Sequence, residues 1–187
     1  MSVSPSKLPL TYEAYAALPE DGRRWELIDG DFEVNPAPSP RHQTVSRRLQ
    51  FELMRALEEP GRALVFDAPI DLILSPHQVL QPDLAIIRSE REALVTERGI
   101  EGPPDIIVEV LSPITRLLDQ RVKKGLYARF AVPEYWMVDP VGGQIELYRL
   151  EPGADFEIER RFDRTSWLTT SSFPELKIEL ARVFRAL

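Results

Sequence analysis

The sequence contains no cysteine. This absence excludes a disulfide framework, a zinc site built on thiolates and a cysteine nucleophile. It also suits a reducing compartment, where disulfides are rare. Any catalytic or metal-binding chemistry in this chain must therefore depend on other side chains.

Long apolar runs are also missing, and none approaches the roughly 20 residues of a membrane-spanning helix. The N-terminus, MSVSPSKLPLTYEAY, lacks the basic segment followed by an apolar segment that is typical of a signal peptide. We therefore expect a cytoplasmic protein without membrane contacts.

Positive charge is scarce, because 23 lysines and arginines face 30 aspartates and glutamates, and the formal net charge is −7. A protein that binds nucleic acid through many phosphates usually carries a basic face. Composition alone thus argues mildly against a nuclease, and any DNA-binding surface must be local. Most of the candidate cations are expected to lie on solvated helix faces. They are Arg41, Arg47, Arg48, Arg116, Arg121, Lys123 and Lys124.

The overall make-up of the chain is typical of a soluble globular protein, with 43% hydrophobic and 28% charged residues among 187. The 17 prolines are spread along the sequence and do not form a linker, and no internal repeat or low-complexity tract is present. We predict one domain over residues 1–187, long enough to enclose its own core.

Helical patterns occur in four places. The clearest begins at Ser39 and Pro40, which suit an N-cap and the first helical position, and ends at Pro60 and Gly61. Its apolar residues recur every four positions, at Val45, Leu49, Leu53 and Leu57. Shorter helices are predicted at 11–18, 115–130 and 174–184.

Short apolar or alternating runs predict strands at 24–28, 31–34, 63–66, 69–74, 79–87, 105–111, 134–139, 145–150 and 156–162. Asp29-Gly30 joins the first two as a hairpin, and residues 88–102 are predicted as a loop with a helical turn. This mixed order of helices and strands predicts an α/β fold with a mixed central sheet and helices on its faces.

Two acids occupy positions where apolar strands should not carry charge. Glu109 interrupts the run DIIVEVL, and Asp83 follows Pro82, which removes a backbone donor and favours a strand start or a bulge. A buried carboxylate must be paired, protonated or bound to metal. An arginine or backbone amides could satisfy either acid alone. Two on adjacent strands favour one hard cation, Mg²⁺ or Mn²⁺.

The helix that follows Glu109 can supply a cation. If its apolar stripe is centred on Val122, Lys123 lies on the flank and Lys124 faces solvent. Lys123 could then lean back over the strand ends. A surface pair with Asp119 is the alternative, and spacing alone favours that alternative.

These stretches resemble the Uma family of putative restriction endonucleases, which belongs to the PD-(D/E)xK nuclease superfamily. The resemblance covers about residues 10–187, and its specificity comes from several motifs in order: WELIDG, PSPRH, QPDLAII, GPPDIIVEVLSP, Asp119-x-x-x-Lys123-x-x-x-Tyr127 and VPEYWMVDP. It implies a restriction-endonuclease-like fold and a magnesium site for cleavage of phosphodiester bonds.

The resemblance also implies roles for particular residues. Asp83 and Glu109 match the two acids, and Lys123 matches a lysine supplied from the following helix, because Leu111 stands where the superfamily pattern has lysine. Metal held by Asp83, Glu109 and the carbonyl of Val110 would activate water, with Lys123 orienting it.

Two further residues match outer positions of the same pattern. Glu26 could bind a second metal or its water shell. His42 could transfer a proton or contact a phosphate, although a histidine at a helix start is more often a surface or capping residue. Ile114 replaces the small polar residue that is usual in the family.

Several other residues are predicted to be structural. The aromatic side chains on strand patterns are expected in the core, Glu134 and Asp139 are expected to have structural roles, and Ser112 lacks a histidine to activate it as a nucleophile. The aromatic residues are Trp25, Tyr135, Trp136 and Tyr148.

Three hypotheses of function remain open at this point. The first is a Mg²⁺-dependent endonuclease acting on DNA, expected to be a homo-oligomer because two sites are needed to cut two strands. The second is a catalytically silent nuclease-fold protein that serves in binding or assembly, which the net charge favours. A metal-dependent hydrolase of another phosphoester is the third.

Overall fold

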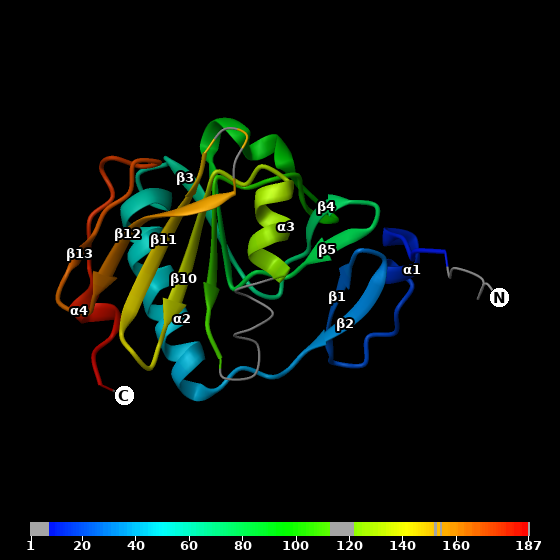
Figure 1. Cartoon of the computed structure of the whole chain (residues 1–187), viewed down its shortest axis with the longest axis horizontal. Coiled ribbons are helices and arrows are strands. Elements are labelled where there is room, and N and C mark those ends of the chain that lie inside the picture. Colours follow the sequence, from blue (N-terminus) through cyan, green and yellow to red (C-terminus); the bar gives the residue numbers. More distant parts are fainter. Residues whose placement is uncertain (1–7, 113–121, 152, 154, 187) are drawn as a thin grey trace.

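A mixed six-stranded sheet forms the centre of the protein (Figure 1). The computed structural model describes residues 8–112, 122–151, 153 and 155–186. Strands β9 and β10 are parallel, and the other neighbours in this sheet are antiparallel. In spatial order the strands are β12 (Phe156–Asp163), β11 (Gln144–Leu150), β10 (Glu134–Asp139), β9 (Ile106–Val110), β6 (Leu84–Arg88) and β3 (Ala63–Asp67). The predicted α/β class with a mixed sheet is confirmed.

Strand β9 is buried along its whole length, as its β-branched sequence predicts. Because successive side chains alternate between the faces of a strand, Val108 points into the cluster beneath helix α2 (Pro40–Leu53). Ile107 points into the opposite cluster, which includes residues of helix α3 (Lys124–Arg129). Glu109 has the same parity as Ile107 and therefore faces α3.

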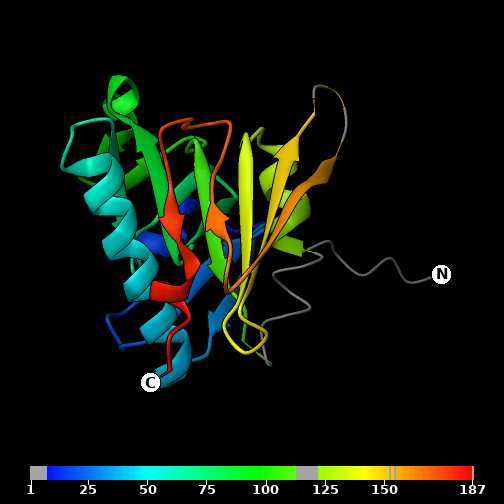
Figure 2. The same cartoon turned by 90° about the vertical axis from the view of Figure 1, so that its left-hand side faces the viewer.

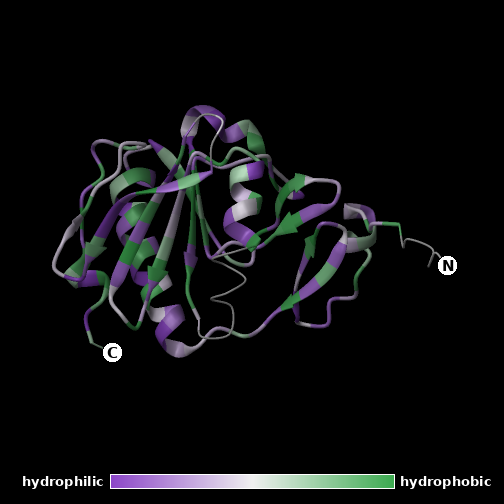
Figure 3. Cartoon of the chain, in the orientation of Figure 1, coloured by the Kyte–Doolittle hydropathy of each residue, from purple (hydrophilic) through white to green (hydrophobic). Residues whose placement is uncertain are grey.

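Helix α2 covers one face of the sheet, as Figure 2 shows. Ser39 caps it as predicted, since its hydroxyl accepts a hydrogen bond of 3.2 Å from the backbone amide of His42. Hydrophobic and hydrophilic residues alternate along α2 (Figure 3), and Val45, Leu49 and Leu53 are buried. The coil continues as a π-helical turn, Met54–Glu58, before the chain enters β3.

A second six-stranded sheet, which the sequence patterns did not predict, lies beside the central one (Figure 1). Helix α1 (Tyr12–Ala16) packs on it. In the stretch predicted as a loop with a helical turn, the 3-10 helix η2 (Ser89–Leu94) confirms the helical turn, whereas β7 and β8 occupy residues that were predicted as loop. In spatial order the strands are β2 (Asp31–Asn35), β1 (Arg24–Ile28), β5 (Gln78–Leu80), β4 (Leu72–Ser75), β8 (Gly99–Glu101) and β7 (Val95–Thr96).

The single strand predicted over residues 79–87 is two strands. β5 ends at Leu80, in the second sheet, and β6 begins at Leu84, in the central sheet. Pro82 lies between them, where it has no amide hydrogen to donate to either ladder. The chain thus crosses from one sheet to the other at Gln81-Pro82-Asp83, which places Asp83 at the start of β6.

The C-terminal segment is less helical than predicted for residues 174–184. Strand β14 (Ile178–Glu179) pairs with β13 (Trp167–Leu168), and only Leu180–Val183 forms helix α4. Ile178 is buried in the core that lies beneath α2, so strand pairing and burial there override the local helical pattern. Of the predicted helix at 115–130, residues 115–121 lie outside the described residues. None of the helices in the described ranges is long and apolar enough to cross a membrane.

The aromatic residues predicted for the core follow that expectation with one exception. Tyr135, Trp136 and Tyr148 are buried, whereas Trp25 is half-buried and packs edge-on against Phe32, with ring centroids 6.0 Å apart. None of these four rings lines the pocket described below.

Glu134 is a structural carboxylate, fully buried at the start of β10. Replacing it with alanine should lower the free energy of unfolding by about 3 kcal/mol, because its partners lose a buried acceptor. Urea unfolding would measure this loss, and Glu157→Ala, at an exposed acid on β12, should change stability by less than about 0.5 kcal/mol. The partners are Trp136 Nε1 at 2.5 Å, Thr170 Oγ1 at 2.6 Å, Ser172 Oγ at 2.6 Å and Arg149 Nη2 at 2.9 Å.

Candidate active site

The two anomalous acids lie opposite each other on neighbouring strands. In the antiparallel pairing of β6 with β9, Leu84 faces Val108, so Asp83 comes opposite Glu109 one position further along. The backbone amide of Val110 donates to Asp83 Oδ2 over 2.8 Å. Asp83 and Glu109 are only 8% and 3% exposed, respectively. The sequence prediction that these two carboxylates meet at one place is consistent with this geometry.

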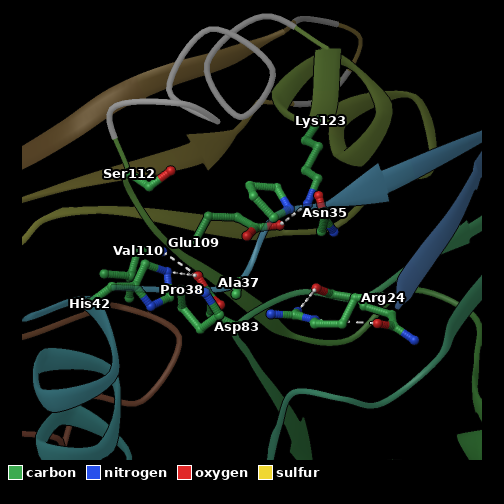
Figure 4. A pocket seen from close by; sticks show the side chains of 12 residues that line it. Arg24, Asn35, Ala37, Pro38, His42, Asp83, Glu109, Val110, Ser112 and Lys123 are labelled. Carbon is green, nitrogen blue, oxygen red and sulfur yellow. Dashed lines mark hydrogen bonds and ion pairs between the residues drawn. The ribbon is translucent and has the colours of Figure 1, made fainter. Parts of the chain in front are cut away.

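Lys123 reaches this place from the turn before α3. Its Nζ lies 3.3 Å from Glu109 Oε1 and 3.0 Å from Glu26 Oε1, and its side chain is 3% exposed. Figure 4 shows Lys123 pointing from above toward Glu109. Glu109 lies on the face of the central sheet that is turned toward α3. Glu26 lies on β1 of the adjoining sheet, so the two acids approach Lys123 from different sheets. Lys123 therefore bridges acids from both sheets.

The helical stripe used to predict Lys123 was centred on the wrong residue. Val122 is 39% exposed, and the buried side of this segment passes through Lys123, Leu126 and Tyr127. Paired carboxylates compensate the buried ammonium group, so a charged residue occupies a position that spacing alone would give to an apolar one. Lys124 is half-buried with its Nζ 4.1 Å from the centre of the Tyr148 ring, away from the two acids. Asp119, the alternative partner of Lys123, lies outside the described residues, as does Ile114.

Glu26 is the most deeply buried of the three acids, at 0% exposure. Its Oε1 accepts hydrogen bonds from the backbone amide of Gln81 over 2.8 Å and is in contact with Lys123. Within the described part of the chain, Oε2 has no hydrogen-bond partner. Two buried carboxylates, Glu26 and Glu109, thus share the buried ammonium group of Lys123.

His42 approaches Asp83 from the first turn of α2. Its Nε2 lies 3.0 Å from Asp83 Oδ2, and Figure 4 shows the ring beside that carboxylate. Its buried Nδ1 has no hydrogen-bond partner among the described residues. The histidine is therefore neither a surface residue nor a capping side chain, which were the common alternatives for a histidine at this position.

These side chains line one pocket at the edge of the central sheet (Figure 4). The segment before α2 forms one wall of it through Asn35 and Pro38. The other lining residues are Arg24, Pro36, Ala37, His42, Gln81, Asp83, Glu109, Val110, Ser112 and Lys123. All five side chains predicted for the site come together here, although Glu26 lies behind Lys123 and does not line the pocket.

Two residues at the site, Arg24 and Tyr127, were not predicted from the sequence to take part in it. Arg24 donates to the side chain and the carbonyl of Gln81, over 3.4 and 3.1 Å. The Tyr127 hydroxyl donates to Glu109 Oε1 over 2.6 Å. Arg24 shares a strand face with Glu26 two residues later, and Tyr127 follows Lys123 by one helical turn. Both spacings were available as signals.

Burial raises the pKa of the Tyr127 hydroxyl well above its usual value, and the charge of Glu109 raises it further. The hydroxyl therefore stays protonated and remains a donor to Glu109. Tyr127→Phe keeps the ring packed against Tyr135 and removes only this hydrogen bond. We expect the free energy of unfolding to fall by about 2 kcal/mol, as for a buried hydrogen bond to a charged group.

The control for Tyr127→Phe is Tyr148→Phe, since the Tyr148 hydroxyl also donates to a carboxylate, that of Glu146, but nearer the surface. Its loss should cost about 1 kcal/mol or less. Equal losses for the two variants in chemical denaturation would contradict a special role for the buried contact.

The donor atoms of this pocket suit a hard divalent cation. Asp83 Oδ1 accepts no hydrogen bond from the described residues, and Val110, whose carbonyl was predicted as a ligand, lines the pocket beside the two carboxylates. No group of three or more histidine and acidic side chains in the described ranges is placed to hold a metal ion. A cation here would complete its coordination with water, as Mg²⁺ commonly does. On donor chemistry and charge, the residues fit such an ion.

A mixed sheet between two helices, with paired acids at the edge of two central strands, defines a restriction endonuclease-like protein. The sequence profile of the Uma2 family, described as "Putative restriction endonuclease", matches residues 12–181, and the chain belongs to this family. The predicted family is confirmed.

A solved structure supports the fold assignment. It is described as a putative nuclease belonging to DUF820 from Anabaena variabilis, and it superposes with a TM-score of 0.76 at 21% sequence identity. The match covers 94% of this chain and 98% of the other. No curated protein matches the sequence.

Proposed function

We propose that the protein is a Mg²⁺-dependent endonuclease, able to use Mn²⁺, that hydrolyses DNA phosphodiester bonds. One observation carries the proposal: two buried carboxylates, Asp83 and Glu109, lie opposite each other at a pocket, with the Lys123 ammonium group 3.3 Å from the second. Membership of a family of restriction endonuclease type supports a nuclease. Two acids and a lysine are the groups that metal-assisted phosphodiester hydrolysis requires.

The residues that would hold the metal are Asp83, Glu109 and, through its carbonyl, Val110. When bound there, Mg²⁺ supplies a water of lowered pKa and neutralises charge on the scissile phosphate. The ammonium group of Lys123 lies where it can orient the attacking water or stabilise the developing negative charge.

The remaining residues position these groups. Tyr127 and Lys123 both bind Glu109 Oε1, which fixes the orientation of that carboxylate. His42 holds Asp83 through Oδ2 and so leaves Oδ1 directed to the pocket. Glu26 holds Lys123, a role that its contacts with Lys123 and with the Gln81 amide favour over binding a second metal.

A catalytically silent protein of nuclease fold, serving in binding or assembly, is the second candidate. One observation favours it, namely that the described residues contain no cluster of three metal-binding side chains. We favour the enzyme because membership of a family of restriction endonuclease type and the presence of Asp83, Glu109 and Lys123 in one pocket both support a nuclease.

The test is cleavage of supercoiled plasmid and of single-stranded DNA in Mg²⁺, in Mn²⁺ and in EDTA. Wild type should nick or linearise the plasmid only with metal, and Glu109→Ala should be inactive. Glu33→Ala, an exposed acid on β2, is the matched control and should retain activity. A metal-independent product, or equal activity in Glu109→Ala, would refute the mechanism. No cleavage by well-folded wild type would favour the silent alternative.

The number of domains and the oligomeric state belong to the same proposal. We infer one nuclease-like domain over residues 1–187 that acts as a homo-oligomer, since cutting two strands of a duplex needs two sites. Sedimentation of the purified protein would measure the oligomeric state directly.

A further inference from the structure

Positive charge gathers on one side of α2, in a chain whose net charge is −7. A cleft there, which we call the arginine cleft, lies between α2, the turn after β10 and the C-terminal segment. Figures 1 and 2 both show the C-terminal segment passing beside the start of α2. None of the described residues that line it is acidic. Its polar side chains are those of Arg41, Thr44, Arg48, Arg164 and Arg185.

Among the described residues, no carboxylate forms an ion pair with the guanidinium groups of this cleft. The side chains of Arg41 and Arg185 form no hydrogen bond or ion pair with the described residues. Arg48 donates to the carbonyls of Val183, Arg185 and Ala186, over 3.4, 2.6 and 3.3 Å, so its partners carry no charge. The nearest partner of Arg164 is also a carbonyl, that of Gly142 at 3.5 Å.

The arginines lie close enough to repel one another. The pKa of Arg48 is lowered, first by burial and then by the positive charges of Arg185 and Arg47. Like charges brought together without counter-charges lower the stability of a fold, so they indicate a surface that binds an anion.

Two hollows lined by polar and charged side chains, including the acids Asp67 and Glu52, lie between the arginine cleft and the active-site pocket. Arg47 lines a groove that also contains His42 and Asp83, and it lines a second hollow together with Arg48 and Arg185. The arginine cleft and the pocket are thus joined around α2, a helix about 10 Å across with its side chains.

We propose that the arginine cleft binds the phosphate backbone of double-stranded DNA next to the bond that is cut. The choice of DNA rests on the proposed function. Guanidinium groups suit this ligand because they donate to two phosphate oxygens at once. A backbone phosphate recurs every 3.4 Å or so along one strand, so the width of α2 corresponds to about three base pairs between cleft and scissile phosphate. These contacts are independent of base sequence and give affinity and register.

The experiment measures binding without cleavage. Fluorescence anisotropy with a labelled duplex of about 25 base pairs is recorded in EDTA, at salt concentrations from 50 to 200 mM. The double variant Arg41→Gln/Arg185→Gln should bind about tenfold more weakly at low salt, and the slope of log K against log salt should fall by about 2, since each phosphate contact contributes roughly 0.9.

Two further variants make the outcome specific. Arg23→Gln/Arg98→Gln removes the same charge from exposed arginines of the second sheet and should leave affinity and slope within about twofold of wild type. Arg41→Lys/Arg185→Lys keeps the charge and should recover most of the slope. Equal weakening by both glutamine doubles, unchanged binding by the first, or no duplex binding by wild type would overturn the proposal.

Binding and cleavage fail separately in this design. Loss of metal-dependent cleavage with intact metal-free binding bears on the proposed function alone. If Arg41→Gln/Arg185→Gln still cleaves DNA and binds duplex as tightly as wild type, the proposal for the arginine cleft is wrong and the proposed function is unaffected.

Discussion

Asp83→Asn should lower the rate of metal-dependent DNA cleavage by about 10³-fold or more and should abolish stabilisation of the fold by Mg²⁺. The substitution removes one charge and one of the two carboxylates proposed to hold the metal, and the loss of several kcal/mol of charge stabilisation corresponds to that factor in rate. Differential scanning calorimetry with and without Mg²⁺, beside a plasmid cleavage assay, measures both quantities.

Asparagine still offers an oxygen to the Val110 amide, so the metal-free fold should melt within a few degrees of wild type. Asp67→Asn is the control, because Asp67 is an exposed acid in the groove that also includes Asp83. It should keep both cleavage and the Mg²⁺-induced shift in Tm. A Tm shift that survives in Asp83→Asn would place the metal elsewhere.

Lys123→Met should lower the free energy of unfolding by about 3–5 kcal/mol and remove cleavage. The ammonium group is buried between Glu26 and Glu109, and its loss leaves two buried carboxylates without their shared cation. Methionine retains most of the length and apolar volume of the lysine stem. Urea unfolding of the metal-free protein gives the loss in stability, and the plasmid assay gives the activity.

Lys124→Met is the matched control, since its ammonium group lies over the face of the Tyr148 ring. We expect a loss of about 1 kcal/mol or less there, with activity retained. Adding Glu26→Gln to Lys123→Met should restore part of the stability, because one of the two uncompensated charges is then absent. Identical losses for Lys123→Met and Lys124→Met would show that the buried ion pairs carry little stability.

The acids of the candidate site were predictable because charge is conspicuous in apolar strands. Asp83 and Glu109 interrupt runs whose other residues are buried on both faces, so the anomaly alone located them. The position of Lys123 was harder to predict, because spacing alone favoured a surface pair with Asp119 and placed the centre of the apolar stripe at Val122. The burial of an ammonium group depends on Glu26, which is 97 residues away in sequence from Lys123 and on another sheet. The sequence pattern around Lys123 therefore could not indicate that Glu26 would be its partner.

The strands of the central sheet and the hairpin of β1 and β2 were predicted from the sequence, whereas β7 and β8 of the second sheet were not, for a related reason. Strand β9 carries its own signal in a β-branched, fully buried sequence. Strands β7 and β8 are two and three residues long, and β8 pairs in parallel with β4 far back in the chain. Such short strands form because the edge of a strand distant in the sequence is available for pairing. Their own residues show little preference for the strand conformation. The helix predicted for the C-terminal segment is shorter than expected for the same reason, because β14 pairs with β13.

Because the chain crosses from one sheet to the other at Gln81-Pro82-Asp83, the proposed site is assembled from residues of both sheets. Glu26 reaches Lys123 from one sheet, while Asp83 and Glu109 belong to the other, so neither half of the structure contains the whole constellation. The proposed site is therefore complete only where the two sheets pack against each other, and the hairpin of β1 and β2 contributes Glu26 to it.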